Sequence, residues 1–316
     1  MEKFGVFDIN GLSFSNLDAI ASEASRSFEL RLCEMSFMAE SVSRQIKKLM
    51  AEEMSVAEIF AILAEEFDFN ENEPSADVIS ETKNGVKSFL NMLTASDKAN
   101  FSILIREKLS SLGIDIKESD FLPQTESKEL FAYVKSALAD EAFDVFSQEF
   151  DDPRIAYAES FKDACAGVAD KRYGYCILPF EEKSSVRIPS IEKLVADLDL
   201  KIVAITPVFG FEGNADMKYA LIGRDFRIPE NDESTDRYFE ISIPKDSVKL
   251  AELLSSAETF GTGIYKIGTS FVGEDNATTL YSIIFKDGGS SFTNLLIYLS
   301  LFADEYIPVG VYKNIE

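Results

Sequence analysis

The 316-residue sequence predicts an α+β protein built from three successive parts. Residues 16–52 contain neither Pro nor Gly and repeat apolar residues in steps of three and four, the period of an amphipathic helix. Between residues 130 and 208, short apolar strands alternate with helices of about ten residues, which predicts a parallel or mixed sheet. From residue 238 to 312 the order is βαββαβ, the ferredoxin-like arrangement. We place the parts at residues 1–123, 129–228 and 237–316.

The charge of the chain limits its partners. It has 31 Lys and Arg against 55 Asp and Glu, a net charge of −24, and such a surface repels phosphate backbones and anionic lipids. We therefore expect neither a nucleic-acid nor a membrane partner. No stretch approaches the ~18 apolar residues that span a bilayer. The opening MEKFGVFDINGLSF has no basic region before an apolar run, so we expect a cytoplasmic protein without a signal peptide.

The sequence contains no His, and its three cysteines are far apart. The absence of His removes histidine bases, the usual Ser/His and Cys/His nucleophiles and most zinc sites, so we expect no metal and no cofactor. Cys165 and Cys176 lie in a predicted buried helix and strand, and Cys33 belongs to no C-x-x-C motif. We interpret the cysteines as apolar core residues in a reducing compartment.

The first part is predicted to be a helical bundle. The helix over residues 16–52 would be a rod on the order of 50 Å long, which needs later helices or another subunit as partners. A second helix is expected over residues 55–67, with Ser55 as N-cap and Glu58 three residues later. Two more are expected over residues 75–93 and 96–112, the latter ending at Gly113.

Basic residues gather on the long helix, at Arg26, Arg31, Arg44, Lys47 and Lys48. All-helical chorismate mutases use Arg and Lys on a long helix to bind a dicarboxylate. The spacing here differs from that family's, and acidic residues lie between the basic ones. A solvated helix face is the better interpretation.

The middle part is predicted to contain βαβ units. The expected strands are residues 130–134, 154–158, 173–180 and 200–208, followed by a strand in MKYALIGRD at 217–225; the expected helices are residues 136–146, 160–168 and 189–198. The strand YGYCILPF is almost continuously apolar, as a strand covered on both faces should be.

The segment YAESFKDACAGVADKRYGYCILPFEEKSS, followed by a helix and LKIVAIT, resembles the first lobe of prephenate dehydratases. The resemblance runs from about Glu129 to the C-terminus. In that family the strand ends in Leu-Pro-Ile-Glu-Asn-Ser, whose tip contacts the substrate, and a later strand carries a catalytic Thr-Arg-Phe. The resemblance implies a substrate site made by Ser136, Glu181, Lys183, Ser184, Arg187 and Lys218, with Lys218 as the candidate catalytic residue.

The chain also departs from the family pattern. The opening loop at residues 134–137 has no glycine to let backbone N–H groups approach an anion. Glu182 stands at the family's Asn and Lys183 at its Ser, or Ser184 after a one-residue shift.

The later motif is changed as well. Met217, Lys218 and Tyr219 stand at the Thr-Arg-Phe positions, so the hydroxyl is lost and the guanidinium fork becomes a point charge. Only ten residues, PVFGFEGNAD, stand where the family has a second lobe. We therefore expect the cleft that excludes water to be missing.

The last part resembles the ACT domain that binds phenylalanine at a subunit interface in prephenate dehydratases. The expected strands are residues 238–243, 262–268, 278–285 and 307–312, and the expected helices are residues 246–257 and 290–302. The resemblance implies ligand contacts at Asp246, Ser247, Val248, Thr269 and Ser270. These residues replace the family's Gly-Ala-Leu and Glu-Ser-Arg-Pro, so the domain would bind another ligand or only dimerise. We favour dimerisation.

Two functions follow, and a third is weaker. The first is a prephenate-dehydratase-like protein of phenylalanine metabolism that has lost catalysis and acts as a small-molecule sensor or oligomerising regulator. The second is an active prephenate dehydratase, a lyase, with prephenate held by Lys183, Arg187 and Lys218. The third adds chorismate mutase activity in the N-terminal helices. Prephenate or an aromatic amino acid is the expected ligand, and a homodimer or larger homo-oligomer is the expected assembly.

Overall fold

The computed structural model describes residues 14–67, 93–182, 186–209, 217–230, 236–245, 247, 249–272, 278–288, 291–303 and 305–315. The predicted helix at residues 75–93 lies outside these ranges except for Leu93.

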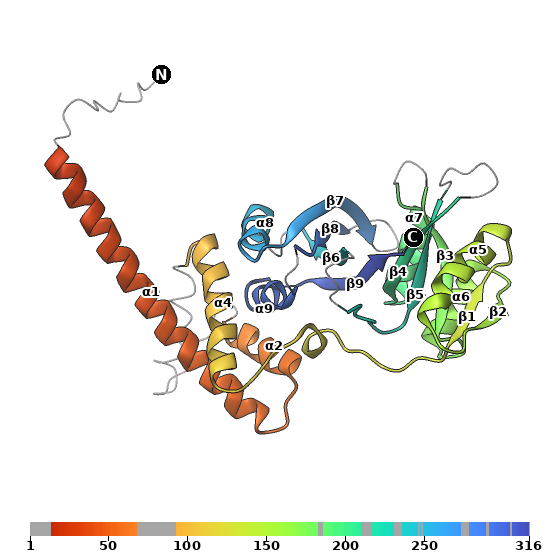
Figure 1. Ribbon diagram of the computed structural model, residues 1–316, viewed down its shortest axis with the longest axis horizontal. Helices are drawn as coiled ribbons and strands as arrows, with labels where there is room; N and C mark the ends of the chain where they lie inside the picture. The colour runs from red at the N-terminus through yellow and green to blue at the C-terminus, as the bar shows by residue number, and fades with distance from the viewer. Residues whose placement is uncertain are drawn as a thin grey trace, which may run out of the picture.

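The N-terminal part is helical, as predicted. Its described helices are α1 (Phe14–Met50), α2 (Val56–Phe67) and α4 (Ala95–Ser111). Helix α1 is a long rod, with α4 beside its C-terminal half and α2 near its end (Figure 1). Its apolar stripe is buried at Met35, Ala39, Val42 and Ile46. The basic residues at 26, 31, 44, 47 and 48 are all exposed, as expected for a solvated face.

Reciprocal capping sets the starts of two of these helices. Ser55 and Glu58 hydrogen-bond each other's backbone N–H groups, as the sequence predicts. Helix α4 begins one residue earlier than predicted, because Thr94 and Asp97 form the same type of box at 3.3 and 3.0 Å.

A single mixed sheet runs through the rest of the molecule, in the order β2-β1-β3-β5-β4-β9-β6-β8-β7. Its strands are β1 (Leu130–Tyr133), β2 (Arg154–Tyr157), β3 (Tyr175–Glu182), β4 (Lys201–Val208), β5 (Met217–Gly223), β6 (Arg237–Pro244), β7 (Gly263–Val272), β8 (Thr278–Lys286) and β9 (Ile307–Asn314). The pairs β1–β2, β1–β3 and β4–β9 are parallel and the other pairs are antiparallel. The predicted α+β fold class is confirmed.

Helices cover the middle strands on both faces. Helix α5 (Ala137–Phe146) contributes to the apolar cluster on one face, and α6 (Phe161–Ala169) and α7 (Pro189–Asp197) contribute to the cluster on the other. Strand β3 is therefore buried from Tyr175 to Glu181, as its apolar sequence predicts.

The parallel pair β4–β9 joins the middle strands to the C-terminal strands. Ile202 lies opposite Gly310, and a Cβ atom at residue 310 would lie 2.4 Å from the carbonyl oxygen of Ile202. Glycine is thus required for the two strands to approach this closely. The three domain boundaries stay predictions, since the middle and C-terminal strands share one sheet.

The C-terminal strands have the order β9-β6-β8-β7, with α8 (Leu250–Thr259) between β6 and β7 and α9 (Thr293–Phe302) between β8 and β9. This is the predicted ferredoxin-like topology. Helix α8 begins at Leu250, later than expected. Ser247 closes a turn on Pro244, and its hydroxyl bonds to the backbone of Glu305 instead of capping the helix.

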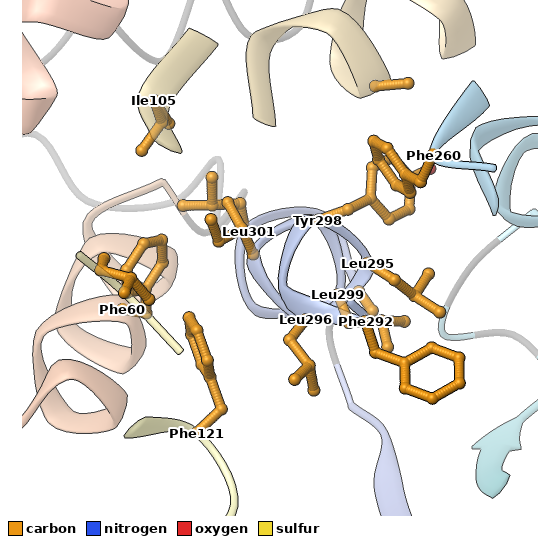
Figure 2. Close-up of a cluster of buried hydrophobic side chains, with 14 of the residues drawn as sticks. Phe60, Ile105, Phe121, Phe260, Phe292, Leu295, Leu296, Tyr298, Leu299 and Leu301 are labelled. Carbon is orange, nitrogen blue, oxygen red and sulfur yellow. The ribbon is translucent and has the colours of Figure 1, made fainter. Parts of the chain in front are cut away.

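Helix α9 lies between this sheet and the N-terminal helices. Figure 2 shows it at the centre of a cluster in which Phe60 and Phe121 lie on one side and Phe260 on another. Leu295, Leu296, Tyr298 and Leu299 are fully buried. Both flanks of α9 are covered, and five consecutive residues from Leu295 to Leu299 are accordingly buried.

Two properties of the described residues bear on function. None of their helices is long and apolar enough to span a membrane, and they contain no group of three metal-ligating side chains. Cys165 and Cys176 are buried with their Sγ atoms 3.9 Å apart, as predicted for core thiols. The same prediction was wrong for Cys33, which is exposed because it lies off the buried stripe of α1.

Candidate functional site

The first predicted site residue lies at the carboxyl end of β1. Ser136 is the N-cap of α5, and its Oγ accepts a hydrogen bond of 3.1 Å from the backbone N–H of Ala139. Burial raises the pKa of the neighbouring Tyr219 phenol, and a hydrogen bond with Ser136 opposes that shift. The Ser136 hydroxyl thus serves the helix start and Tyr219.

Glu181 lies where β3 and β5 change register. The pairing shifts between Pro179 and Glu181, and such an irregularity re-aims the side chain that follows it. The buried carboxylate of Glu181 lies 3.1 Å from Nζ of Lys218, and 3.5 Å from both Nε of Arg187 and Nζ of Lys266. Burial alone would raise the pKa of Glu181, but these three cations outweigh it and lower the pKa.

Among the predicted site residues that the structure describes, Arg187 forms the shortest ion pair. Its Nη1 and Nη2 atoms donate bonds of 2.6 Å to the two carboxylate oxygens of Glu240. Tyr312 donates to the same carboxylate at 3.1 Å, and the guanidinium lies 4.4 Å from the ring centroid of Phe180. Burial would lower the pKa of Arg187, but the charge of Glu240 raises it well above its ordinary value.

These residues form one ion-pair network, which we define as Glu181, Arg187, Lys218, Glu240 and Lys266. It draws its side chains from β3, the bridge residue at 187, β5, β6 and β7. Each of its three cations is within ion-pair distance of a carboxylate of the same chain. With two carboxylates and three cations, the network carries a formal charge of +1, and it links the middle strands to the C-terminal strands.

The structure brings together only some of the predicted site residues. Glu181, Arg187 and Lys218 meet in the network. Lys183, Ser184, Asp246 and Val248 lie outside the described residues. In the C-terminal part, Ser247 bonds to Glu305, Thr269 is an exposed residue of β7, and Ser270 pairs through its backbone with Leu280 of β8.

Sequence reasoning missed Glu240, Lys266 and Tyr312. Glu240 had a usable signal, because it is a charged residue inside the otherwise apolar strand YFEISIP. A buried carboxylate in such a strand requires a cation, although the sequence does not say which one.

A second buried ion-pair cluster joins the segment before β1 to the C-terminal strands. Arg237 lies 3.0 Å from Glu118 and 2.6 Å from Asp287, and Glu118 also accepts the backbone N–H of Phe292 at 2.7 Å. All three charged side chains are almost fully buried. The contacts give this cluster a structural role.

Comparisons with known proteins give likenesses of structure alone. No family model matches the sequence, and no curated protein matches it. The prephenate dehydratase of Streptococcus mutans aligns with a TM-score of 0.47 and 14% identity, covering 59% of this chain and 99% of that one. A structure described as GqqA, a novel type of quorum quenching acylase, aligns with a TM-score of 0.45 and 18% identity, covering 59% and 96%. The prephenate dehydratase of Arthrobacter aurescens in complex with L-Phe aligns with a TM-score of 0.41 and 8% identity, covering 58% of this chain and 89% of that one. Function is not transferred at these scores, so any proposal depends on the residues of this chain.

Proposed function

We propose that this chain is a prephenate-dehydratase-like protein of aromatic amino-acid metabolism that has lost catalysis and acts by sensing a small molecule or by oligomerising in the cytoplasm. The motif order from Glu129 onward supports the ancestry. One observation supports the loss of catalysis. Lys218 pairs with Glu181, and Arg187 pairs with Glu181 and Glu240, so neither cation is free to bind a substrate anion.

The energetics of the network oppose binding of a dicarboxylate such as prephenate. Arg187 would have to exchange its two bonds to Glu240 for bonds to the ligand. That exchange leaves the buried carboxylate of Glu240 without its main counter-charge, and breaking a buried pair costs about 3–5 kcal/mol. Contacts between the ligand and Arg187 must offset that cost for the ligand to bind.

The residue before Lys218 opposes the chemistry as well. Met217 stands at the position of the family's catalytic Thr, so this position offers no hydroxyl to the leaving group. General acid catalysis requires a proton donor within hydrogen-bond reach of the departing oxygen. Lys218 is the nearest described cation in sequence, and it already pairs with Glu181.

The second candidate is an active prephenate dehydratase, and the exposure of Lys218 favours it. About 30% of that side chain is exposed, whereas Arg187 is 10% exposed. In this alternative Lys218 turns outward, and Lys183 and Arg187 complete the anion site. A chorismate-mutase function of the N-terminal helices is weaker still, because Arg31 and Arg44 pair with Asp97 and Glu40.

The ferredoxin-like strands support the regulatory half of the proposal. In an ACT-like role, Asp246, Ser247, Val248, Thr269 and Ser270 would contact an aromatic amino acid at the interface of a homodimer. The use of the Ser247 hydroxyl by Glu305 favours dimerisation over ligand binding.

Titration calorimetry with prephenate and with L-phenylalanine, together with sedimentation at micromolar concentration, tests the proposal. We expect a dimer or larger assembly and no saturable binding of prephenate. Prephenate binding that Lys218→Ala weakens would favour the active enzyme, and a strict monomer would contradict the oligomeric regulator.

A further inference from the structure

A cavity of about 390 Å³ lies on the sheet face that α5 covers. Its apolar floor includes Phe146 at the end of α5, Val203 and Ala204 of β4, and Leu221 of β5. Its polar rim includes Glu149, Arg227, Glu230 and Lys313. The cavity shares no residue with the ion-pair network, and its volume lies in the range of small-molecule sites.

A β-bulge shapes the floor. The register of β4 shifts between Ile202 and Ala204 against both of its neighbours, β5 and β9. Both Val203 and Ala204 consequently line the cavity, although successive residues of a regular strand point to opposite faces. Bulges of this kind are common next to functional sites.

Arg227 on the rim stacks on an aromatic ring without a carboxylate partner among the described residues. Its guanidinium lies 3.9 Å from the ring centroid of Phe150 and donates a bond of 2.9 Å to the backbone carbonyl of Glu149. Within the described part of the chain, no carboxylate forms an ion pair with Arg227. By contrast, the other described arginines that lie over aromatic rings, Arg172, Arg187 and Arg237, each pair with a carboxylate.

Because no described carboxylate pairs with Arg227, its positive charge is available to a ligand. Most of the described arginines pair with a carboxylate in this acidic chain, whereas Arg227 does not. Stacking on Phe150 fixes the plane of the Arg227 fork, and such a fork matches a carboxylate with two parallel bonds. The second rim cation, Lys313, is balanced by Glu149 at 3.1 Å.

We propose that this cavity binds a small organic acid, with its carboxylate on Arg227 and its apolar body on the floor formed by Phe146, Val203 and Leu221. The ligand class is a monocarboxylate with an aryl or medium-length alkyl body. This site is additional to the proposed function, because it uses neither the ion-pair network nor the ACT-like positions.

Titration calorimetry of the full chain with 3-phenylpropanoate, 3-phenylpropanamide and acetate tests the proposal. We expect saturable binding of 3-phenylpropanoate and at least about tenfold weaker binding of its amide and of acetate, which lack the charge and the apolar body respectively. Arg227→Gln should weaken 3-phenylpropanoate binding by at least about tenfold. Arg172→Gln, an exposed arginine outside the cavity that pairs with Asp163, is the matched control and should leave binding unchanged.

Two further variants test the cavity independently of Arg227 and of the ion-pair network. Ala204→Leu adds bulk to the floor and should block the probe even if Arg227→Gln fails to fold. Lys218→Ala changes the ion-pair network but not the cavity, so it should leave 3-phenylpropanoate binding unchanged. The cavity proposal and the proposed function can therefore fail independently of each other. Equal binding of acid and amide, normal binding by both cavity variants, or no saturable binding at millimolar probe would overturn the proposal.

Discussion

Arg187 donates two hydrogen bonds of 2.6 Å to Glu240, a residue 53 positions further along the chain. The pair joins the segment between β3 and α7 to strand β6. Tyr312 of β9 and Ser282 of β8 donate to the same carboxylate at 3.1 and 3.4 Å. The carboxylate of Glu240 is therefore a meeting point for the middle and C-terminal strands.

Removing one member of this pair should destabilise the protein strongly. Glu240→Gln leaves the Arg187 guanidinium buried without its main counter-charge, and we expect the free energy of unfolding to fall by about 3–5 kcal/mol. The double variant Arg187→Met/Glu240→Leu should cost less than the sum of the single changes, because no charge is left unpaired. Urea unfolding measures each value.

The exposed pair Arg44–Glu40 supplies the control for that experiment. Its atoms are 2.5 Å apart, but both side chains are more than 40% exposed. Glu40→Gln should change the free energy of unfolding by less than about 0.5 kcal/mol. If Glu240→Gln lowers the free energy of unfolding no more than Glu40→Gln does, the buried pair does not stabilise the fold.

The stabilising effect of Glu181 should depend on pH. Lys218, Lys266 and Arg187 hold its pKa below the ordinary value despite burial, so the folded state binds its proton less readily than the unfolded state. The resulting stability is present above the unfolded pKa of about 4.3 and is lost as pH falls through the lowered folded pKa.

Wild type and Glu181→Gln can be unfolded in urea at a series of pH values between about 7 and 3, spanning that pKa. The stability advantage of the wild type should shrink with acidification. An advantage that stays constant or grows would mean that the carboxylate is not stabilised by the three cations.

The joint between β4 and β9 should tolerate no side chain at residue 310. A Cβ atom there would lie 2.4 Å from the Ile202 carbonyl oxygen, so Gly310→Ala should lower the free energy of unfolding by about 1–3 kcal/mol. Gly268→Ala on β7 is the matched control, because nothing lies within 4 Å of the added atom. We expect that variant to stay within about 0.5 kcal/mol of wild type. Equal losses in the two variants would argue against the close β4–β9 pairing.

Thiol labelling should divide the cysteines into two classes. Cys33 is exposed and should react quickly with a thiol reagent in the native protein. Cys165 and Cys176 are buried, and burial raises the pKa of the Cys176 thiol, so both should react only on unfolding. Cys33→Ser should abolish the fast phase, and a second fast thiol in that variant would contradict the buried packing.

The local elements could be predicted because their signals are local. Helix α5 and strand β1 each lie within one residue of the predicted ranges, since Ser136 is a standard N-cap and LFAY is a compact apolar run. The start of α8 was predicted too early, because the Ser247 hydroxyl bonds to Glu305, 58 residues away.

The candidate site could be predicted only in part, for the same reason. Glu181 and Lys218, both expected from the family resemblance to lie at one site, come together through the β3–β5 pairing. The contacts of Glu240 with Arg187 and of Lys266 with Glu181 depend on the joint between β4 and β9, which brings the C-terminal strands into the same sheet. No local pattern in the sequence encodes that joint, apart from the glycine at 310.

Incubation of the purified chain with prephenate near neutral pH, with phenylpyruvate formation followed over time, tests the central claim most directly. We predict no formation above the spontaneous rate, for the wild type and for Lys218→Ala alike, because each cation of the site already pairs with a carboxylate of the same chain. Turnover above the spontaneous rate that Lys218→Ala abolishes would contradict the account and show that the network opens to accept the substrate.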